Sequence, residues 1–330
     1  GSSLSDRKST SLLFTMLGYA RPYWKFMILT VISVVMVSLS QLAAPMLIRE
    51  MVSLVTTADL MLVRKALTIG VWLAVTYLLK SLFQGFRTYF AHRAAWDFVS
   101  DIRIKVYSHI QDLSLGFFHN RQVGQLLSRV VNDPAHLEVL IAHVVPDIIV
   151  NIVLLAGILV LLFVIEPILA AISLLFLPLI FISIYRYSNV VRPLFKESQQ
   201  SLSELSAVVA EDISGIREIQ AFNRQNRESQ RVTEHSVRYA NAVMYALTKG
   251  AVYHPQIDFF NNLTSAVVLA AGGILAAYGR VSAADLVAFM LYLGLLQGPV
   301  STLGRLNEDF QTAMASIERI DEIQIGRAHV

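Results

Sequence analysis

Residues 105–133 read KVYSHIQDLSLGFFHNRQVGQLLSRVVND, and this polar stretch lies between two long apolar runs. The apolar side chains around its start recur with helical spacing, at Ile104, Tyr107 and Ile110. A break begins at Gly116, and a second helical pattern begins after Gly124. The stretch therefore predicts two helices that meet at a short turn presenting Phe117 and Phe118. Two exposed aromatic side chains on a polar turn need a partner surface that buries them.

The composition predicts an all-α membrane protein. The 330-residue chain is 55% hydrophobic and 15% charged, with a mean hydropathy of +0.56, whereas a soluble domain carries about 25% charged residues. A transmembrane β-barrel would show short alternating segments instead of long apolar runs. The absence of cysteine excludes disulfides and thiolate metal sites. The net charge of +3 does not predict a nucleic-acid partner, because the charges fall where membrane topology would place them.

Six apolar runs are long enough to cross a hydrocarbon core of about 30 Å. The predicted spans are residues 26–48, 66–86, 148–165, 168–185, 259–278 and 286–304. Residues 49–65, the pair Glu166-Pro167 and residues 279–282 are the predicted loops on one side. On the other side two helical excursions carry arms of roughly 25 residues, or ~35–40 Å at 1.5 Å per residue. The sequence therefore predicts six transmembrane helices with long cytoplasmic helical extensions.

The ends of the chain are predicted as separate short segments. Residues 1–3 are interpreted as a cloning scar and residues 326–330 as a vector-derived tail. Residues 4–22 are amphipathic and predict an elbow helix in the membrane interface, ahead of a membrane domain at residues 23–325. Most of the 27 lysines and arginines lie in the two excursions and the terminal segments. The positive-inside rule therefore predicts that both termini and both excursions are cytoplasmic.

Three segments resemble ABC-type exporters of the bacterial multidrug and lipid class. LSLGFFHNRQVGQLLSRVVND (113–133) resembles their first cytoplasmic loop, EDISGIREIQAFNRQNRES (211–229) the second, and GRVSAADLVAFMLYLGLLQGPVSTL (279–303) the last span. The resemblance implies a half-transporter in the bacterial inner membrane, paired with a second copy or a homologous half. It also implies alternating access, driven by coupling helices that dock on nucleotide-binding domains. The implied coupling residues are Phe117, Phe118, Asn120, Arg121, Gln122, Gly215, Ile216, Arg217 and Phe222.

One departure from the family pattern is large. The 330 residues contain no GxxxxGK[ST] phosphate loop and no signature motif. We therefore expect that this polypeptide is not an enzyme by itself. The resemblance implies ATP and Mg²⁺ only for a nucleotide-binding domain, either removed by truncation, which we favour, or carried on another chain.

Several polar side chains within the spans are candidates for a substrate path. They are Gln41, Lys80, Gln84, Asn151, Asp258, Asn262, Tyr292 and Gln297. Lys80 can alternatively extend to the interface, and the amides and Tyr292 can serve as interhelical hydrogen bonds. The mostly apolar lining favours a hydrophobic or amphipathic substrate such as a drug or lipid, with peptides as an alternative. Hinge or packing positions are predicted at Pro255, Gly294, Gly298 and Pro299.

Other polar groups carry weaker predictions. Arg129 and Asp133 are four residues apart and can pair on one helix for roughly 0.2–0.5 kcal/mol. A role for them in interlocking the cytoplasmic helices is implied by the resemblance only. The scattered histidines predict no metal site, and no catalytic arrangement stands out; the histidines considered are His92, His109, His119, His136 and His143. Two alternative functions stay open, an ATP-independent carrier and a regulatory or scaffold subunit that transports nothing.

Overall fold

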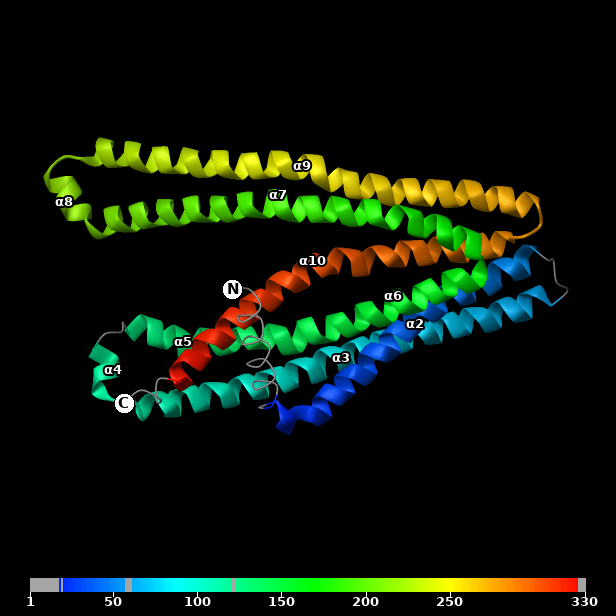
Figure 1. The fold of residues 1–330 in the computed structure, drawn as a ribbon, viewed down its shortest axis with the longest axis horizontal. Helices are drawn as coiled ribbons and strands as arrows, with labels where there is room; N and C mark the ends of the chain where they lie inside the picture. Colours follow the sequence, from blue (N-terminus) through cyan, green and yellow to red (C-terminus); the bar gives the residue numbers. More distant parts are fainter. Residues whose placement is uncertain (1–17, 19, 57–60, 120–122, 326–330) are drawn as a thin grey trace. The chain divides into compact units, whose positions relative to one another are not determined.

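The computed structural model describes residue 18 and residues 20–56, 61–119 and 123–325. The elements of that part are all helical: η1 (Arg21–Tyr23), α2 (Trp24–Thr56), α3 (Leu62–Gln111), α4 (Leu115–His119), α5 (Val123–Val139), η2 (Leu140–Val144), α6 (Val145–Ile165), α7 (Pro167–Ser214), α8 (Ile216–Ala221), α9 (Gln225–Ala277) and α10 (Ala283–Ile325) (Figure 1). Five helices there are long and apolar enough to cross a membrane, and α10 begins with a shorter apolar stretch, Ala283–Leu296. The predicted all-α membrane fold is confirmed. Residues 1–3, most of the predicted elbow helix at 4–22 and residues 326–330 lie outside the described part.

The long helices continue well past the membrane. α3, α7 and α9 contain 50, 48 and 53 residues. A helix of that length measures roughly 70–80 Å at 1.5 Å per residue, more than twice the hydrocarbon thickness of about 30 Å. The prediction that spans run on as helical arms is confirmed.

Some predicted boundaries are wrong. The loop at residues 49–65 is much shorter than predicted, since α2 continues to Thr56 and α3 begins at Leu62. α3 ends at Gln111, five residues before the predicted turn at Gly116. Gly116 itself lies inside the next helix, α4, which begins at Leu115. The predicted short connection at Glu166-Pro167 has its counterpart in Glu166, which alone separates α6 from α7 and has an extended backbone.

The chain divides into two compact units, each described here by itself. The first contains residues 1–167 and 272–330. Within it α10 packs against α2, α5 and α6, and α3 packs against α2 and α5. α5 continues into α6 through η2, a five-residue π-helical turn that the sequence does not predict.

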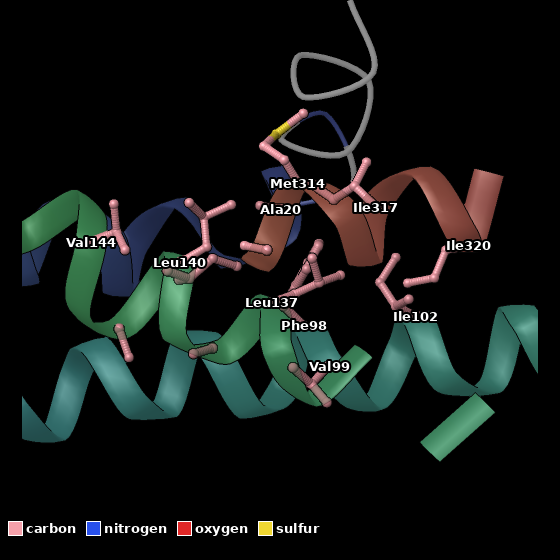
Figure 2. Close-up of a cluster of buried hydrophobic side chains, with 14 of the residues drawn as sticks. Ala20, Phe98, Val99, Ile102, Leu137, Leu140, Val144, Met314, Ile317 and Ile320 are labelled. Carbon is pink, nitrogen blue, oxygen red and sulfur yellow. The ribbon is translucent and has the colours of Figure 1, made fainter. Parts of the chain in front are cut away.

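The first unit has a hydrophobic core outside the apolar spans, in the arms of α3, α5 and α10 (Figure 2). Its largest fully buried side chains come from three separate helices: Ile102, Leu137, Ile317 and Ile320. On α3 the buried stripe is Phe98, Ile102, Val106 and Ile110. Ile104 and Tyr107 are exposed, whereas Ile110 is buried, so the helical spacing of these three predicts the helix but does not identify its buried face. Burying each such side chain stabilises the bundle by about 1.5–3 kcal/mol.

The second unit, residues 168–271, is a helical hairpin. α7 and α9 run side by side, and α8 joins their ends (Figure 1). Ion pairs connect the arms, with Arg231 of α9 at 2.8 Å from Glu211 and Arg238 at 3.6 Å from Glu204 of α7. α9 stays helical through Pro255, although proline removes one backbone hydrogen bond there.

Candidate functional site

The first tip is α4, one short helix between α3 and α5. The rings of Phe117 and Phe118 meet edge to face with their centroids 5.6 Å apart, and Phe118 is exposed. Three of the implied coupling residues, Asn120, Arg121 and Gln122, lie outside the described part of the chain. The predicted short turn carrying two aromatic side chains is therefore present as a helix of five residues.

The second tip is α8, which begins after Gly215 and contains no buried residue. Ile216 and Arg217 are exposed, and Phe222 at its end is 74% exposed. Asn223 follows with φ of 53°, a left-handed conformation that asparagine adopts more readily than most residues. This turn ends α8 and leads the chain into α9, which leaves the aromatic ring of Phe222 facing outward.

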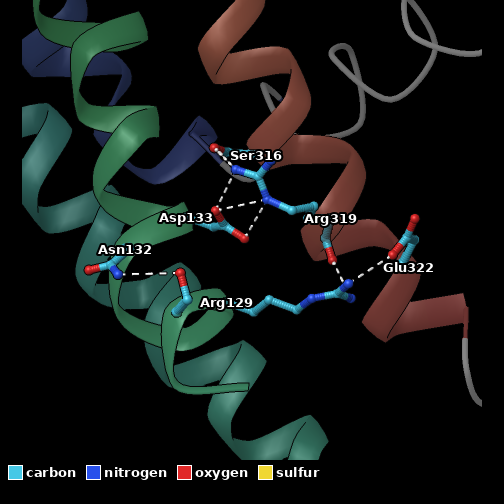
Figure 3. A network of polar contacts seen from close by, with 7 residues as sticks. Arg129, Asn132, Asp133, Ser316, Arg319 and Glu322 are labelled. Carbon is cyan, nitrogen blue, oxygen red and sulfur yellow. Dashed lines mark hydrogen bonds and ion pairs between the residues drawn. The ribbon is translucent and has the colours of Figure 1, made fainter. Parts of the chain in front are cut away.

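A buried ion pair joins the arm behind the first tip to the end of α10 (Figure 3). Asp133 of α5 has a side chain only 4% exposed. Arg319 of α10 donates from Nε to both carboxylate oxygens at 3.0 Å and from Nη2 to Oδ1 at 2.6 Å. Nη2 also donates to Ser316 Oγ at 2.9 Å. The hydrogen bond to Asp133 raises the pKa of the Arg319 guanidinium above its ordinary value.

Arg129 lies one turn from Asp133 on α5, yet it does not pair with it. Its guanidinium lies 3.1 Å from the carboxylate of Glu322 on α10 and donates to the carbonyl oxygen of Arg319 at 3.4 Å. The predicted pair between Arg129 and Asp133 is wrong, because both side chains reach across to α10. These contacts agree with the interlocking of helices that the resemblance implies. We call the four residues Arg129, Asp133, Arg319 and Glu322 the arm clamp.

The candidate path residues are not gathered in one place. Tyr292 of α10 is completely buried and donates to the carbonyl oxygen of Leu42 on α2 at 2.6 Å. Gln41 has a buried Oε1 with no hydrogen-bond partner among the described residues. Lys80 and Asn151 are half-buried, on α3 and α6.

The other path candidates are exposed or not described. Gln84 is exposed on α3, and the side chain of Gln297 lies outside the described part. Asp258 and Asn262 are exposed on α9, where Asp258 lies 3.6 Å from His254. Tyr292 therefore acts as an interhelical hydrogen-bond donor, and the path assignment of the others stays a prediction.

Apart from the backbone of α10 itself and the chain neighbours, no atom of the described residues lies within 4 Å of a Cβ added at Gly294 or Gly298. Close packing at these glycines stays a prediction. Close packing occurs at Gly157 of α6, where an added Cβ would overlap a methyl carbon of Leu42 on α2. Pro299 lies inside α10, which continues as a helix. A hinge role for these positions and for Pro255 stays a prediction.

Sequence reasoning also missed ion pairs that join helices far apart in the chain. Arg49 lies 2.6 Å from Asp285, and Arg280 lies 3.3 Å from Glu166, both near the ends of helices. Arg87 of α3 pairs with Asp147 of α6. Isolated charges at the edges of apolar runs are the only signal that could have indicated these pairs.

A comparison with known protein families assigns the chain to one of them. The model of the ABC transporter transmembrane region matches residues 27–300. The chain belongs to this family. In this ABC transporter region, the long arms and the two short tip helices are the parts that lie beyond the apolar spans.

Curated bacterial relatives of this ABC transporter chain are similar at low identity. YgaD of Bacillus subtilis, a putative multidrug export ATP-binding/permease protein, is 24% identical over 308 residues, 92% of this chain and 53% of the relative. YfiC, an uncharacterized ABC transporter ATP-binding protein of the same species, is 25% identical over 251 residues, 76% of this chain and 42% of its own. A putative multidrug export ATP-binding/permease protein of Staphylococcus aureus is 26% identical over 233 residues, which are 71% of this chain and 40% of the relative. The chain thus spans about half or less of these relatives.

Proposed function

We propose that this chain is the substrate-translocating membrane half of an ATP-driven exporter. Membership of the ABC transporter transmembrane family supports this proposal, as does the similarity to relatives named as multidrug export ATP-binding/permease proteins. The single observation that carries the proposal is the pair of short helices, α4 and α8, each at the end of two long arms.

The tips have the chemistry of docking elements. α8 contains no buried residue, and Phe222 beside it is 74% exposed. Phe118 presents an exposed ring on α4. Exposed aromatic side chains on short helices gain stability when a partner surface covers them. We propose that each tip docks on a nucleotide-binding domain, which supplies the ATP and Mg²⁺ chemistry.

The arms are suited to carry the motion of a docked tip to the spans. The helix from Val123 to Ile165 runs from the first tip to the far end of α6 without a non-helical residue. The arm clamp fastens its first part to α10. A displacement of α4 would therefore move α5 and α10 together. In the proposed cycle two such chains alternate between inward-open and outward-open states, with tips and termini in the cytoplasm.

The chemistry of the spans supports a proposal for the substrate class. The apolar windows of the five long helices have mean hydropathies between 1.5 and 3.3 with no more than two charged residues each. A cavity lined by such helices would suit a hydrophobic or amphipathic compound better than a small hydrophilic anion. We propose a lipophilic drug-like compound or a lipid as the substrate, carried between two copies or two homologous halves.

A chimera tests this function. The full chain is fused to the ATP-binding part of YgaD, reconstituted in vesicles, and assayed for ATPase stimulation and uptake of a lipophilic cationic dye. We expect stimulated ATPase and ATP-dependent uptake, both reduced when Phe118 and Phe222 are replaced by alanine. Arg224→Ala, next to the second tip, is the matched control. Uptake without ATP would support a carrier, and stable folding with neither activity for any compound tested would support a scaffold; either result would overturn the proposal.

A further inference from the structure

Three ligand-type side chains from separate positions converge near the membrane end of the α3 and α5 arms. They are His92 of α3, Glu138 of α5 and His143 of η2. Nδ1 of His92 lies 2.7 Å from Oε1 of Glu138. The rings of His92 and His143 are nearly perpendicular with centroids 5.0 Å apart. Ligand atoms of all three lie within 4.8 Å of one another.

The π-helical turn is what brings His143 to this place. Residues five apart on a regular α-helix point about 140° away from each other, at 3.6 residues per turn. Glu138 and His143 are five residues apart. His143 lies within η2, where the Val145 N–H donates to the Leu140 carbonyl oxygen. This wider turn rotates the chain less per residue and brings both side chains toward α3. Single π turns inside α-helices occur frequently at functional sites.

The charge environment favours a cation. Among the described residues no lysine or arginine forms an ion pair with Glu138, whose carboxylate is 13% exposed and contacts His92. The two arginines of α3 nearest to His92 in the sequence have other partners, since Arg87 pairs with Asp147 and Arg93 pairs with Asp97. The carboxylate of Glu138 is largely buried and has an imidazole as its partner. A bound metal cation would stabilise its negative charge.

We propose that His92, Glu138 and His143 bind a divalent transition-metal ion, with zinc as the best match. Two imidazole nitrogens and one carboxylate oxygen are a ligand set that zinc accepts at about 2.0–2.1 Å. Ligand atoms around such a tetrahedral ion are roughly 3.3 Å apart. Side-chain rotation must therefore widen the 2.7 Å contact between His92 and Glu138 and shorten the longer separations, which do not exceed 4.8 Å. His143 is exposed, which leaves the fourth position open to water. The ion would fasten α3 to the α5–α6 helix, the two arms that carry the tip α4.

Metal binding by the full chain tests the proposal directly. The chain is purified with a tag free of histidine, stripped with chelator, and titrated with zinc chloride by calorimetry and by metal analysis after gel filtration. We expect one zinc per chain. Glu138→Gln and His143→Ala should each weaken binding at least tenfold, whereas His136→Ala, an exposed histidine on α5, should leave it unchanged.

Cobalt provides a second readout, which would not appear if His92, Glu138 and His143 only stabilised the packing of the helices. Co²⁺ in place of zinc should give the intense visible absorption of a four-coordinate site, and this absorption should disappear in His143→Ala. Circular dichroism of each variant confirms that it is folded. The proposal is overturned if zinc does not bind, if it binds equally to wild type and the two cluster variants, or if the cobalt spectrum is that of the hydrated ion.

Discussion

The arm clamp makes the sharpest energetic prediction. Replacing Arg319 by methionine keeps the apolar stem but leaves Asp133, with its side chain 4% exposed, without its three hydrogen bonds from the guanidinium. Removing one partner of a buried ion pair costs about 3–5 kcal/mol. Arg319 is itself 42% exposed, so water screens part of the pair and we expect about 2–3 kcal/mol of lost unfolding free energy.

A double-mutant cycle separates the pair from other effects of the substitution. Asp133→Asn, Arg319→Met and the double variant should give a coupling energy of at least ~1.5 kcal/mol, since the two side chains share one site. The matched control is Arg129→Met with Glu322→Gln. Glu322 is 62% exposed and contacts Arg129 at 3.1 Å, so its coupling should not exceed ~0.5 kcal/mol.

The unfolding free energy is measured by titration with sodium dodecyl sulfate, followed by circular dichroism. The control coupling should vanish at about 0.5 M salt, where exposed charges are screened beyond a few ångströms. The coupling of Asp133 with Arg319 should persist there. Equal couplings for both pairs, or none for Asp133 with Arg319, would refute the assignment of a buried clamp.

Two further substitutions test the packing. Ile317→Ala in the arm core should reduce the unfolding free energy by about 2–5 kcal/mol, while Leu127→Ala, at a position 61% exposed, should change it by less than ~1 kcal/mol; similar losses from both would show that the core is misplaced. Gly157→Val should lower the Tm, because the added side chain overpacks the contact with α2 at a cost of about 1–3 kcal/mol. Gly294→Ala should keep or raise the Tm through better helix propensity, and a large drop would reveal a covered surface at Gly294.

The helices, their overrun of the membrane and the two tips could be predicted from sequence. Their signals are local: apolar length, 3.6-residue spacing, and a break such as Gly215. The break predicted at Gly116 is misplaced, since Gly116 lies inside α4. The buried face of α3 could not be predicted correctly. Ile104 and Tyr107 recur with helical spacing just as Ile102 and Val106 do, and only the partner helices decide which face is covered.

Long-range partners were beyond sequence reasoning for the same reason. Asp133 and Arg319 are 186 residues apart, whereas spacing along a helix indicates only neighbours such as Arg129. The metal-ligand cluster depends on a π turn over LIAHV, residues 140–144, which contains neither proline nor glycine. Nothing in its composition predicts the extra residue in that turn, so His143 could not be assigned to the face of Glu138.

The central claim is that α4 and α8 lie on the cytoplasmic side, well away from the bilayer. The chain has no cysteine, so single cysteines at Gly116 and Arg217, with one at Tyr278 as the control for the opposite end, can be labelled individually. A membrane-impermeant maleimide should label the two tip positions only in inside-out vesicles and position 278 only in right-side-out vesicles. Labelling of either tip from the outside, or protection of both by lipid in both orientations, would contradict the account.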